Sequence, residues 1–392
     1  MKAKYYMGVN QFFLGAVALF GTLGLLAGTV PSNAQAQDIL IGVSTPASGP
    51  AAIASEREMW GVNLAVDEIN AAGGLLGGRK LKTMVVDNRC NPSEAVNAAN
   101  KLIEAKPVAI IGAHCSSASL AMMPLIKDAK IPLVGGVASS PRITDLSGIG
   151  GNEWTFRTNP SDAAMMEALV GYLADKKIFK KVAVIAEDTD FGRGGANSFV
   201  ELAKKAGLEI ISVDFPPQNT PDFTSLLTRI SRSKPDAVAL FQLGGDQLNL
   251  LRNAMQMGLR IPYTGRAELG GENMQIIQAG GMENSISTWS YSTAIDSPTN
   301  KAFIAKITER HKLAPVLQTW AGYDNVRVIA QAITEAASAD PVKVRDALSK
   351  VKFQTVMGPV VSFDERNQAG KIVLVQQVKN RAISIAELLN MK

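Results

Sequence analysis

Hydrophobic positions divide the chain into short β-branched and aliphatic runs that alternate with longer stretches of helical spacing. Up to about residue 160, the predicted strands are 39–44, 82–87, 108–112 and 131–134, and the predicted helices are 58–72 and 93–105. Trp60, Leu64 and Ile69 give the first helix an apolar stripe, and Ser93 is the expected N-cap of the second. This order predicts right-handed crossovers and a mainly parallel sheet covered by helices.

The same alternation restarts after residues 157–162. It predicts strands at 182–186, 210–215, 237–241 and 261–263, and helices at 192–205, 223–232 and 247–257. Two late helices, 299–311 and 323–337, and a last strand, 372–378, complete the predicted elements.

Two successive units of this kind predict an α/β protein with two lobes. We expect the chain to cross back to the first lobe near residues 289–291 and to leave it again near 361–363. The first lobe would then comprise 38–160 plus 291–361, and the second 161–290 plus 362–392. Three strands that link two lobes form a hinge, and the cleft between the lobes is the expected ligand site.

The first 36 residues have the layout of a bacterial secretory signal peptide. Lys2 and Lys4 precede a stretch from residue 12 to 30 that is apolar or small, and Ala34-Gln35-Ala36 supplies a small-x-small cleavage site. A transmembrane anchor is the alternative, since the run is nearly long enough to span a bilayer. We expect cleavage, a mature chain beginning near Gln37, and a periplasmic protein. The apolar run has no cysteine at its end that could carry a lipid.

Charge and cysteine content narrow the possible partners. The 40 Lys+Arg and 35 Asp+Glu give a net charge of +5, which falls to +3 once the two leader lysines are removed. No stretch concentrates positive charge, so neither nucleic acid nor an anionic membrane is an expected partner. The two cysteines, Cys90 and Cys115, are expected to form a disulfide in an oxidising compartment; paired metal ligands or a reactive thiol are the alternatives.

Two small-residue loops follow strands of the first lobe and are candidate ligand contacts. Residues 111–119 follow a strand and lead into a helix. The free N–H groups and the partial positive charge at the N-terminus of that helix suit a carboxylate, and Ser116 and Ser117 add hydroxyls. The alternative is that Ser117 only caps the helix. The loop 135–141 carries Ser139, and both loops should meet at the same crevice.

Catalysis has little support in the sequence. His114 and His311 are the only histidines, and the chain has no nucleophile elbow, zinc-protease motif or Cys/His metal spacing. A hydrolase that uses Ser116 would need a distant base. Glu187, Asp188 and Asp190 could bind a cation, but their spacing is not that of a calcium loop, so we expect neither metal nor cofactor.

The chain resembles the periplasmic Leu/Ile/Val-binding proteins, the type I substrate-binding components of branched-chain amino-acid ABC transporters. The matching motifs run in family order over nearly all of the chain after the leader. They are Ser48-Gly49-Pro50, Ile69-Asn70-Ala71-x-Gly73-Gly74, Asp87-x-x-Cys90-Asn91-Pro92, Gly112-x-His114-Cys115-Ser116-Ser117, Arg157-Thr158 and Met357-Gly358-Pro359. The resemblance implies the two-lobed type I fold and places Cys90 and Cys115 where the family carries its disulfide.

The resemblance also implies a set of ligand contacts. Ser116 would hold the ligand carboxylate, and the backbone N–H of Ser139 would assist it. The Ser139 hydroxyl and the Val137 carbonyl would face the ammonium. Phe191, in the place of a family tyrosine, would close over the ligand.

Departures from the family pattern leave the ligand side chain open. Ala54 stands where the family has a tyrosine, and Leu243 lies near another tyrosine position. The family acid that pairs with the ammonium falls at Ala267, so Glu268, or else Glu272, is the expected substitute. An amino acid is the expected ligand, and an aliphatic or aromatic carboxylate without an amine is the alternative.

The sequence therefore predicts an exported binding protein, not an enzyme, that closes its hinge on a small carboxylate, most plausibly a branched-chain or related amino acid. Its expected partner is the membrane permease of an ABC importer, and a monomer is expected. A periplasmic sensor that signals to a receptor is the rival, and the sequence does not separate the two.

Overall fold

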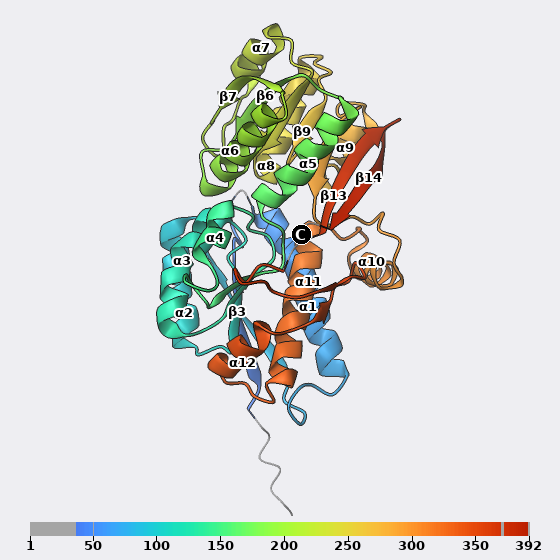
Figure 1. The fold of residues 1–392 in the computed structure, drawn as a ribbon. Helices are drawn as coiled ribbons and strands as arrows, with labels where there is room; N and C mark the ends of the chain where they lie inside the picture. The colour runs from blue at the N-terminus through green and yellow to red at the C-terminus, as the bar shows by residue number, and fades with distance from the viewer. Residues whose placement is uncertain (1–36, 50, 370–371, 391–392) are drawn as a thin grey trace, which may run out of the picture. The chain divides into compact units, whose positions relative to one another are not determined.

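We analysed a computed structural model that describes residues 37–49, 51–369 and 372–390. The predicted signal peptide lies outside the described residues. The part of the chain that follows is one compact unit of alternating strands and helices. The predicted α/β class is confirmed (Figure 1).

A five-stranded parallel sheet forms the first lobe, with the strand order β2-β1-β3-β4-β5. The strands are β1 (Ile39–Thr45), β2 (Leu81–Asp87), β3 (Ala109–Gly112), β4 (Leu133–Gly135) and β5 (Thr155–Arg157). The helices that follow them in sequence are α1 (Ala52–Ala71), α2 (Pro92–Glu104), α3 (Ser116–Ala129) and α4 (Pro141–Leu146). Two later helices, α11 (Leu317–Glu335) and α12 (Pro341–Leu348), pack on the same lobe, and α10 (Pro298–His311) precedes them.

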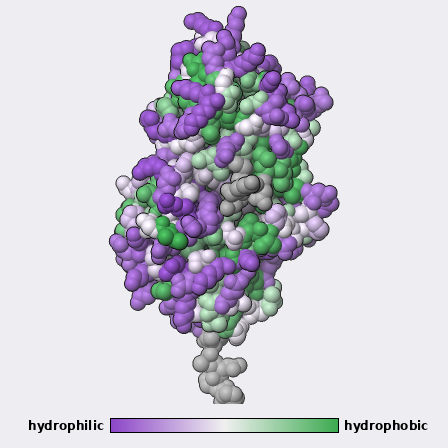
Figure 2. Space-filling view, in the orientation of Figure 1, coloured by the Kyte–Doolittle hydropathy of each residue, from purple (hydrophilic) through white to green (hydrophobic). Residues whose placement is uncertain are grey.

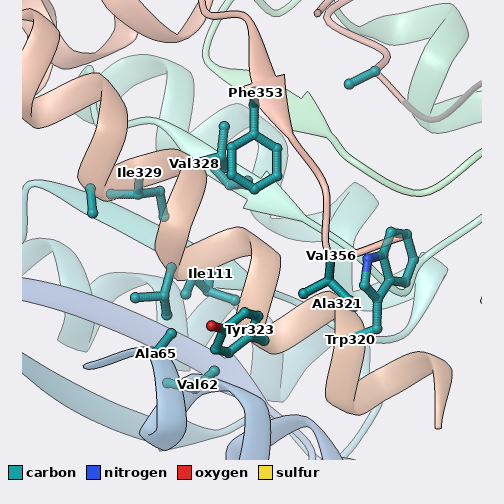
Figure 3. Packing of buried hydrophobic residues seen from close by; sticks show 14 of the residues in the cluster. Val62, Ala65, Ile111, Trp320, Ala321, Tyr323, Val328, Ile329, Phe353 and Val356 are labelled. Atoms are coloured by element: carbon teal, nitrogen blue, oxygen red, sulfur yellow. The ribbon is translucent and has the colours of Figure 1, made fainter. Parts of the chain in front are cut away.

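Alternation along the strands explains why helices cover both faces of this sheet. In β3, Ile111 belongs to the apolar cluster with α1 and α11, whereas its neighbour Ile110 belongs to the cluster with α2 and α3. Successive side chains of a strand point to opposite faces, so both faces of a buried parallel sheet need apolar residues. Figure 3 shows Ile111 packed with Val62 and Ala65 of α1 and with Tyr323 of α11.

Glycines allow α1 and α11 to cross with their backbones in contact. A Cβ added at Gly61 would lie 1.9 Å from the Thr319 carbonyl oxygen, and one at Gly322 would lie 2.3 Å from the Glu58 carbonyl oxygen. Only residues without a side chain fit at such a crossing. The close crossing fixes α1, whose first turn follows the β1 loop, against the sheet.

A four-stranded parallel sheet with the order β7-β6-β8-β9 forms the second lobe. Its strands are β6 (Lys181–Ala186), β7 (Glu209–Asp214), β8 (Ala237–Phe241) and β9 (Tyr263–Gly265). Its helices are α5 (Asp162–Lys176), α6 (Asp190–Lys205), α7 (Thr224–Arg232), α8 (Gly244–Gln256), the 3-10 turn η1 (Gly271–Asn273) and α9 (Met274–Gln278). Val184 of β6 packs with α5 and α6, and the adjacent Ile185 packs with α7 and α8, which repeats the two-faced pattern of the first sheet.

An antiparallel sheet of order β10-β13-β14 ends the fold beside the second lobe. It consists of β10 (Ile286–Trp289), β13 (Ile372–Lys379) and β14 (Ala382–Asn390), and a short hairpin of β11 (Phe353–Gln354) and β12 (Val360–Val361) precedes it. In Figure 2, hydrophilic residues cover most of the visible face, and hydrophobic residues gather over β13 and β14. Within the described ranges, no helix combines the length and apolarity that a membrane span requires.

Three chain crossings between the lobes are tied together by polar side chains. Asn159, in the first crossing, accepts a hydrogen bond from the Ser290 hydroxyl of the second (2.5 Å). Gln368, in the third, donates to the Asn159 carbonyl (2.7 Å). The three connections expected of the hinge are therefore joined through Asn159, and the third is joined at Gln368, beyond the expected crossing near 361–363.

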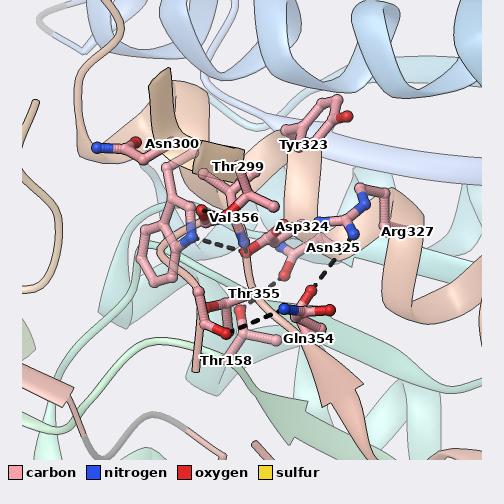
Figure 4. A network of polar contacts seen from close by, with 12 residues as sticks. Thr158, Thr299, Asn300, Tyr323, Asp324, Asn325, Arg327, Gln354, Thr355 and Val356 are labelled. Carbon is pink, nitrogen blue, oxygen red and sulfur yellow. Dashed lines mark hydrogen bonds and ion pairs between the residues drawn. The ribbon is translucent and has the colours of Figure 1, made fainter. Parts of the chain in front are cut away.

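A second polar network fixes the segment before the third crossing. The buried Asp324 carboxylate accepts hydrogen bonds from the Trp320 indole N–H (2.7 Å) and the Val356 N–H (3.1 Å), and it pairs with Arg327 (2.7 Å) (Figure 4). Asn325 accepts from the Thr158 hydroxyl (2.7 Å), which links α11 to the first crossing. These contacts fix the first crossing and the segment around Val356 against α11.

Several predicted bounds were wrong, each for a local reason. α1 begins six residues before the predicted start at 58, because residues 52–55 (Ala-Ile-Ala-Ser) show no apolar periodicity and yet belong to the helix. Ser93 is not the N-cap of α2: Asn91 is, and its side chain accepts from the N–H groups of Ser93 (2.9 Å) and Glu94 (3.2 Å). The prediction lacked α5 altogether, and it also missed β5, α4, α12 and β14.

Candidate functional site

The loop between β3 and α3 ends at a helix N-terminus that is held in place from several sides. The Asn88 amide donates to the Ala113 carbonyl (3.1 Å), and the Ser119 hydroxyl accepts from the Ala113 N–H (3.1 Å). Cys90 and Cys115 form the predicted disulfide, with 5.4 Å between their Cα atoms and 25 residues of sequence separation. The first intrahelical bond of α3 runs from the Ser119 N–H to the Cys115 carbonyl, so the N–H groups of the preceding residues open the helix and suit an anion.

A buried hydrogen bond between side chains supports this loop. The His114 Nδ1 lies 2.9 Å from the Glu58 carboxylate of α1, and the two side chains are 2% and 1% exposed. The Thr45 hydroxyl donates to the same carboxylate oxygen (2.9 Å). Buried polar side chains need hydrogen-bond partners, so these contacts join α1, β1 and the loop before α3.

The serine residues predicted to bind the ligand lie close together and are buried. The Ser116 hydroxyl accepts a hydrogen bond from the Ser140 N–H (3.1 Å), which joins the two loops. The Ser139 hydroxyl donates to Asp162 (3.0 Å), and the Asp162 N–H donates back to the Ser139 carbonyl (2.8 Å). The Val137 carbonyl accepts from the Asn159 amide (3.0 Å), so the hinge contacts the same loop. Ser117 does not cap α3: it accepts from the Asp190 N–H (3.2 Å).

Phe191 lies in the first turn of α6, on the second lobe, and is partly buried. The loop before it is fixed by Glu187, whose carboxylate accepts from the Leu243 N–H (2.8 Å) and from the Thr189 hydroxyl (2.7 Å). Burial raises the pKa of Glu187 to about 7, and the Leu243 N–H works against this shift. Leu243 packs against the apolar cluster of the first lobe to which Cys90, Cys115 and Ala138 belong.

The acids predicted to meet an ammonium have different surroundings. Glu268 is partly buried, and its Oε1 lies against Gly271, where an added Cβ would come within 2.7 Å. Burial raises the pKa of Glu268 to about 7; the nearby Glu272 adds to the rise, and Arg266 opposes it. Glu272 is exposed and lies 3.4 Å from the Arg57 guanidinium of α1. Ala267, at the family position of the acid, is buried.

A further buried pair lies beside Ser139 and was not predicted. Asp162, at the start of α5, is fully buried, and its Oδ1 lies 3.5 Å from the Nε of Arg266. Burial raises the pKa of Asp162 to about 6, while Arg266 and the Ser139 hydroxyl oppose the shift. The Arg266 guanidinium also lies over the Trp289 ring, 4.3 Å from its centre.

Contacts between the lobes place the candidate residues in a closed arrangement. Arg142 of α4 pairs with Asp190 of α6 (2.6 Å), and Arg57 pairs with Glu272 on the other lobe. A Cβ added at Gly194 of α6 would lie 3.1 Å from the Ser140 hydroxyl. The structure therefore brings Ser116, Val137 and Ser139 into one loop cluster, with Phe191 and Glu268 on the lobe that faces it.

The acidic residues 187, 188 and 190 each bind partners within the protein. Asp188 pairs with Arg193 (2.5 Å), Asp190 with Arg142, and Glu187 accepts hydrogen bonds from its own loops. In the described part of the chain, no group of three or more His, Cys, Asp or Glu side chains could hold a metal ion.

Comparison with known proteins now assigns the class. The sequence profile of the family described as periplasmic binding protein matches residues 38–382, and the chain belongs to this family. It is 27% identical over 348 residues to the leucine-, isoleucine-, valine-, threonine- and alanine-binding protein of Pseudomonas aeruginosa, covering 89% of this chain and 91% of that relative. The predicted two-lobed type I fold and the family resemblance are thereby confirmed.

Solved structures of similar fold include binders of two kinds of ligand. The branched-chain amino-acid transporter substrate-binding protein LivJ of Streptococcus pneumoniae, solved with isoleucine, has a TM-score of 0.79 and 25% identity over 90% of this chain and 99% of that one. An ABC-transporter solute-binding protein of Rhodopseudomonas palustris, solved with 3,4-dihydroxybenzoic acid, has a TM-score of 0.79 and 23% identity over 90% and 96%.

Sequence reasoning missed Glu58 and Asp162, two buried acids next to the candidate site. Glu58 lies on the apolar side of α1, four residues before Val62, which suggests an internal position. Asp162 follows Ser161, whose hydroxyl accepts from the Ala164 N–H as an N-cap. The sequence Ser161-Asp162 before an Ala- and Met-rich stretch was an available sign of a helix start.

Buried acids predict that the folded protein is most stable below neutral pH. Asp162 and Asp324, with pKa values raised to about 6, and Glu187 and Glu268, raised to about 7, bind protons more tightly when folded than when unfolded. Stability therefore falls as pH rises from about 5 to 8, because the unfolded chain has already released these protons. His311, whose pKa is lowered by burial, opposes the trend with one group.

Melting temperatures of the ligand-free protein between about pH 5 and pH 8 measure this effect. We expect a higher melting temperature at the acidic end and a flatter profile for Glu187→Gln. A melting temperature that rises steadily up to pH 8 would contradict the assignment of these protonated acids.

Proposed function

We propose that this protein is the exported substrate-binding component of an ABC importer and that it binds a small amino acid of the branched-chain type. The observation that carries the proposal is the pair of loops at the start of α3 and after β4. There, the buried Ser116 hydroxyl is bonded to the loop of Ser139 through the Ser140 N–H, and the buried Ser139 hydroxyl is bonded to Asp162 at the start of α5.

The ligand contacts follow from this geometry. Ser116 and the N–H groups that open α3 bind the ligand carboxylate, and the Ser139 hydroxyl and the Val137 carbonyl receive the ammonium. Phe191 covers the ligand from the second lobe, and Glu268 supplies negative charge there. The partly buried Ala54 and Leu243 take the places of bulkier family side chains and leave room for an aliphatic group.

Ligand binding would close the hinge, because only in the closed form does the ligand contact both lobes. The moving bodies would be 38–160 plus 291–361 and 161–290 plus 362–392. A ligand that touches both bodies shifts the equilibrium to the closed form by its differential affinity. A membrane permease would then recognise the closed protein, which acts as a monomer in the periplasm after removal of residues 1–36.

The protein is not an enzyme in this proposal, because no base among the described residues is hydrogen-bonded to Ser116. His114, the nearest histidine in sequence, is paired with Glu58, and the Ser116 hydroxyl accepts from a backbone N–H. A carboxylate without an amine is the second candidate ligand, because Ala267 replaces the family acid and a protein of this fold was solved with a dihydroxybenzoic acid.

A thermal-shift screen of the purified protein, stripped of bound ligand, tests the proposal. The ligands are aliphatic amino acids, their deaminated counterparts, aromatic acids and small amides. Binding to the folded state stabilises the protein by mass action and thereby raises its melting temperature. The gain in the free energy of unfolding is about 2.7 kcal/mol when the ligand concentration is a hundred times Kd. We expect shifts with leucine, isoleucine or valine. No shift with any carboxylate would overturn the proposed function.

A further inference from the structure

Two buried serine hydroxyls at the candidate site have opposite hydrogen-bonding capacity left for a ligand. The Ser116 hydroxyl accepts from the Ser140 N–H, so its own hydrogen remains free to be donated. The Ser139 hydroxyl gives its only hydrogen to Asp162, so it can only accept from a ligand. A hydroxyl has one donor hydrogen and two acceptor lone pairs, which makes this difference decisive.

These capacities match the two ends of an α-amino acid. A carboxylate only accepts hydrogen bonds, so it fits the free Ser116 hydrogen, and an ammonium only donates, so it fits the Ser139 oxygen. The opposite orientation would place two acceptors, or two donors, against each other.

Asp162 has an acceptor atom to spare in the same place. Its Oδ1 is fully buried and has no hydrogen-bond partner among the described residues, although the Arg266 Nε lies 3.5 Å away. Its Oδ2 and its backbone N–H both bond to Ser139, which fixes the carboxylate next to the hydroxyl. Leaving a buried carboxylate oxygen without a partner is costly, and an N–H donor from a ligand would remove that cost.

We propose that Asp162 binds the ligand ammonium together with Ser139, and that the site therefore selects an α-amino carboxylate over the same acid without its amine. This inference rests on the proposed function. Asp162 replaces the acid that the family carries at the position of Ala267. Glu268, whose carboxylate lies against Gly271, contributes charge from the second lobe.

The charged groups around Asp162 are compatible with an added cation. Arg266 approaches its Oδ1, but the flat face of that guanidinium is taken by the Trp289 ring, and its Nη1 is directed at the Met165 sulfur. Arg157, the other nearby cation, bonds to Gln368 (2.6 Å) and to the Ser140 carbonyl (2.9 Å). Glu268 is a second acid near Arg266, and its negative charge favours an added cation at this place.

Calorimetric titrations with two matched pairs of probes test the inference: L-leucine with 4-methylpentanoate, and L-phenylalanine with 3-phenylpropanoate. We expect the wild-type protein to bind the amino acid of a pair at least about 100-fold more tightly than its amine-free partner. Asp162→Asn should weaken amino-acid binding by about 10–100-fold and leave the amine-free acid within a few-fold, which closes the gap. Asp246→Asn is the matched control and should leave both affinities unchanged: the buried Asp246 carboxylate lies in α8 and, among the described residues, accepts from the Asn219 N–H.

A second pair of variants covers the case in which Asp162→Asn does not fold. Ser139→Ala should reduce the preference for the amino acid, and Ser139→Thr, which keeps the hydroxyl, should retain it. Amino-acid binding that is unaffected by Asp162→Asn would overturn the inference and leave the proposed function standing. Binding of amine-free acids alone would overturn both the inference and the amino-acid ligand of the proposed function, and would favour the second candidate ligand. If none of the four probes binds, the result would instead contradict the proposed branched-chain or related amino-acid ligand itself.

Discussion

Replacing Ser116 by alanine is expected to lower ligand affinity by about 10–100-fold. The hydroxyl hydrogen is free for the carboxylate, because its oxygen accepts from the Ser140 N–H. The alanine would lose that donor and would also leave the Ser140 N–H, buried with its residue, without its acceptor. The N–H groups that open α3 remain in place, so binding should weaken without being abolished.

Calorimetric titration with the ligand selected by the screen measures this loss. Ser117→Ala is the comparison, because the Ser117 hydroxyl already accepts from the Asp190 N–H across the cleft and should affect affinity less. Melting temperatures of both ligand-free variants separate a change in stability from a change in binding. Equal affinities of wild type and Ser116→Ala would refute this placement of the site.

The largest loss of stability is expected for Gly61→Ala. The added Cβ would lie 1.9 Å from the Thr319 carbonyl oxygen and 2.7 Å from the Tyr323 nitrogen, both of them backbone atoms that cannot turn aside. α1 and α11 would have to move apart and open the apolar cluster shown in Figure 3. We expect a loss of about 3 kcal/mol or more, or failure to fold.

Gly171→Ala provides the control for this substitution, since it is the same change inside a helix. A Cβ at Gly171 of α5 meets no atom within 4 Å, so alanine should be neutral or should stabilise by up to about 1 kcal/mol. Denaturant unfolding of the two variants measures the difference. A Gly61→Ala protein as stable as wild type would mean that the two helices do not cross as described.

The sequence allowed the class of fold to be predicted because its evidence is local and repeated. β-branched runs such as 182–186 and helical stripes such as that of Trp60, Leu64 and Ile69 need no knowledge of distant contacts. β14 was missed because its residues 382–389, Ala-Ile-Ser-Ile-Ala-Glu-Leu-Leu, include only two strand-forming isoleucines, whereas alanine, glutamate and leucine favour a helix.

The candidate site was predictable only where a motif identified it. Ser116 and Ser139 could be chosen because they lie in strand-end loops and match a family pattern. Asp162 could not, because its role depends on contacts with Ser139, 23 residues earlier, and with Arg266, more than 100 residues later. The partner of Glu58 is His114, 56 residues away, so the helical position of Glu58 could suggest burial but could not identify this contact.

The start of a helix was also missed or misplaced at two positions. The Ser161 cap was overlooked because residues 157–162 were interpreted only as the break between two units. At α2, the N-cap is Asn91 instead of Ser93, because Pro92 fits the first helical position and fixes the start one residue earlier.

A crystal structure of the protein with the amino acid selected by the screen tests the central claim most directly. The account predicts one ligand between the lobes, with its carboxylate within hydrogen-bond distance of the Ser116 hydroxyl and the N–H groups that open α3. Its ammonium should contact the Ser139 hydroxyl and the Asp162 Oδ1. A ligand bound outside the cleft, or one with its amine at Ser116, would contradict the account.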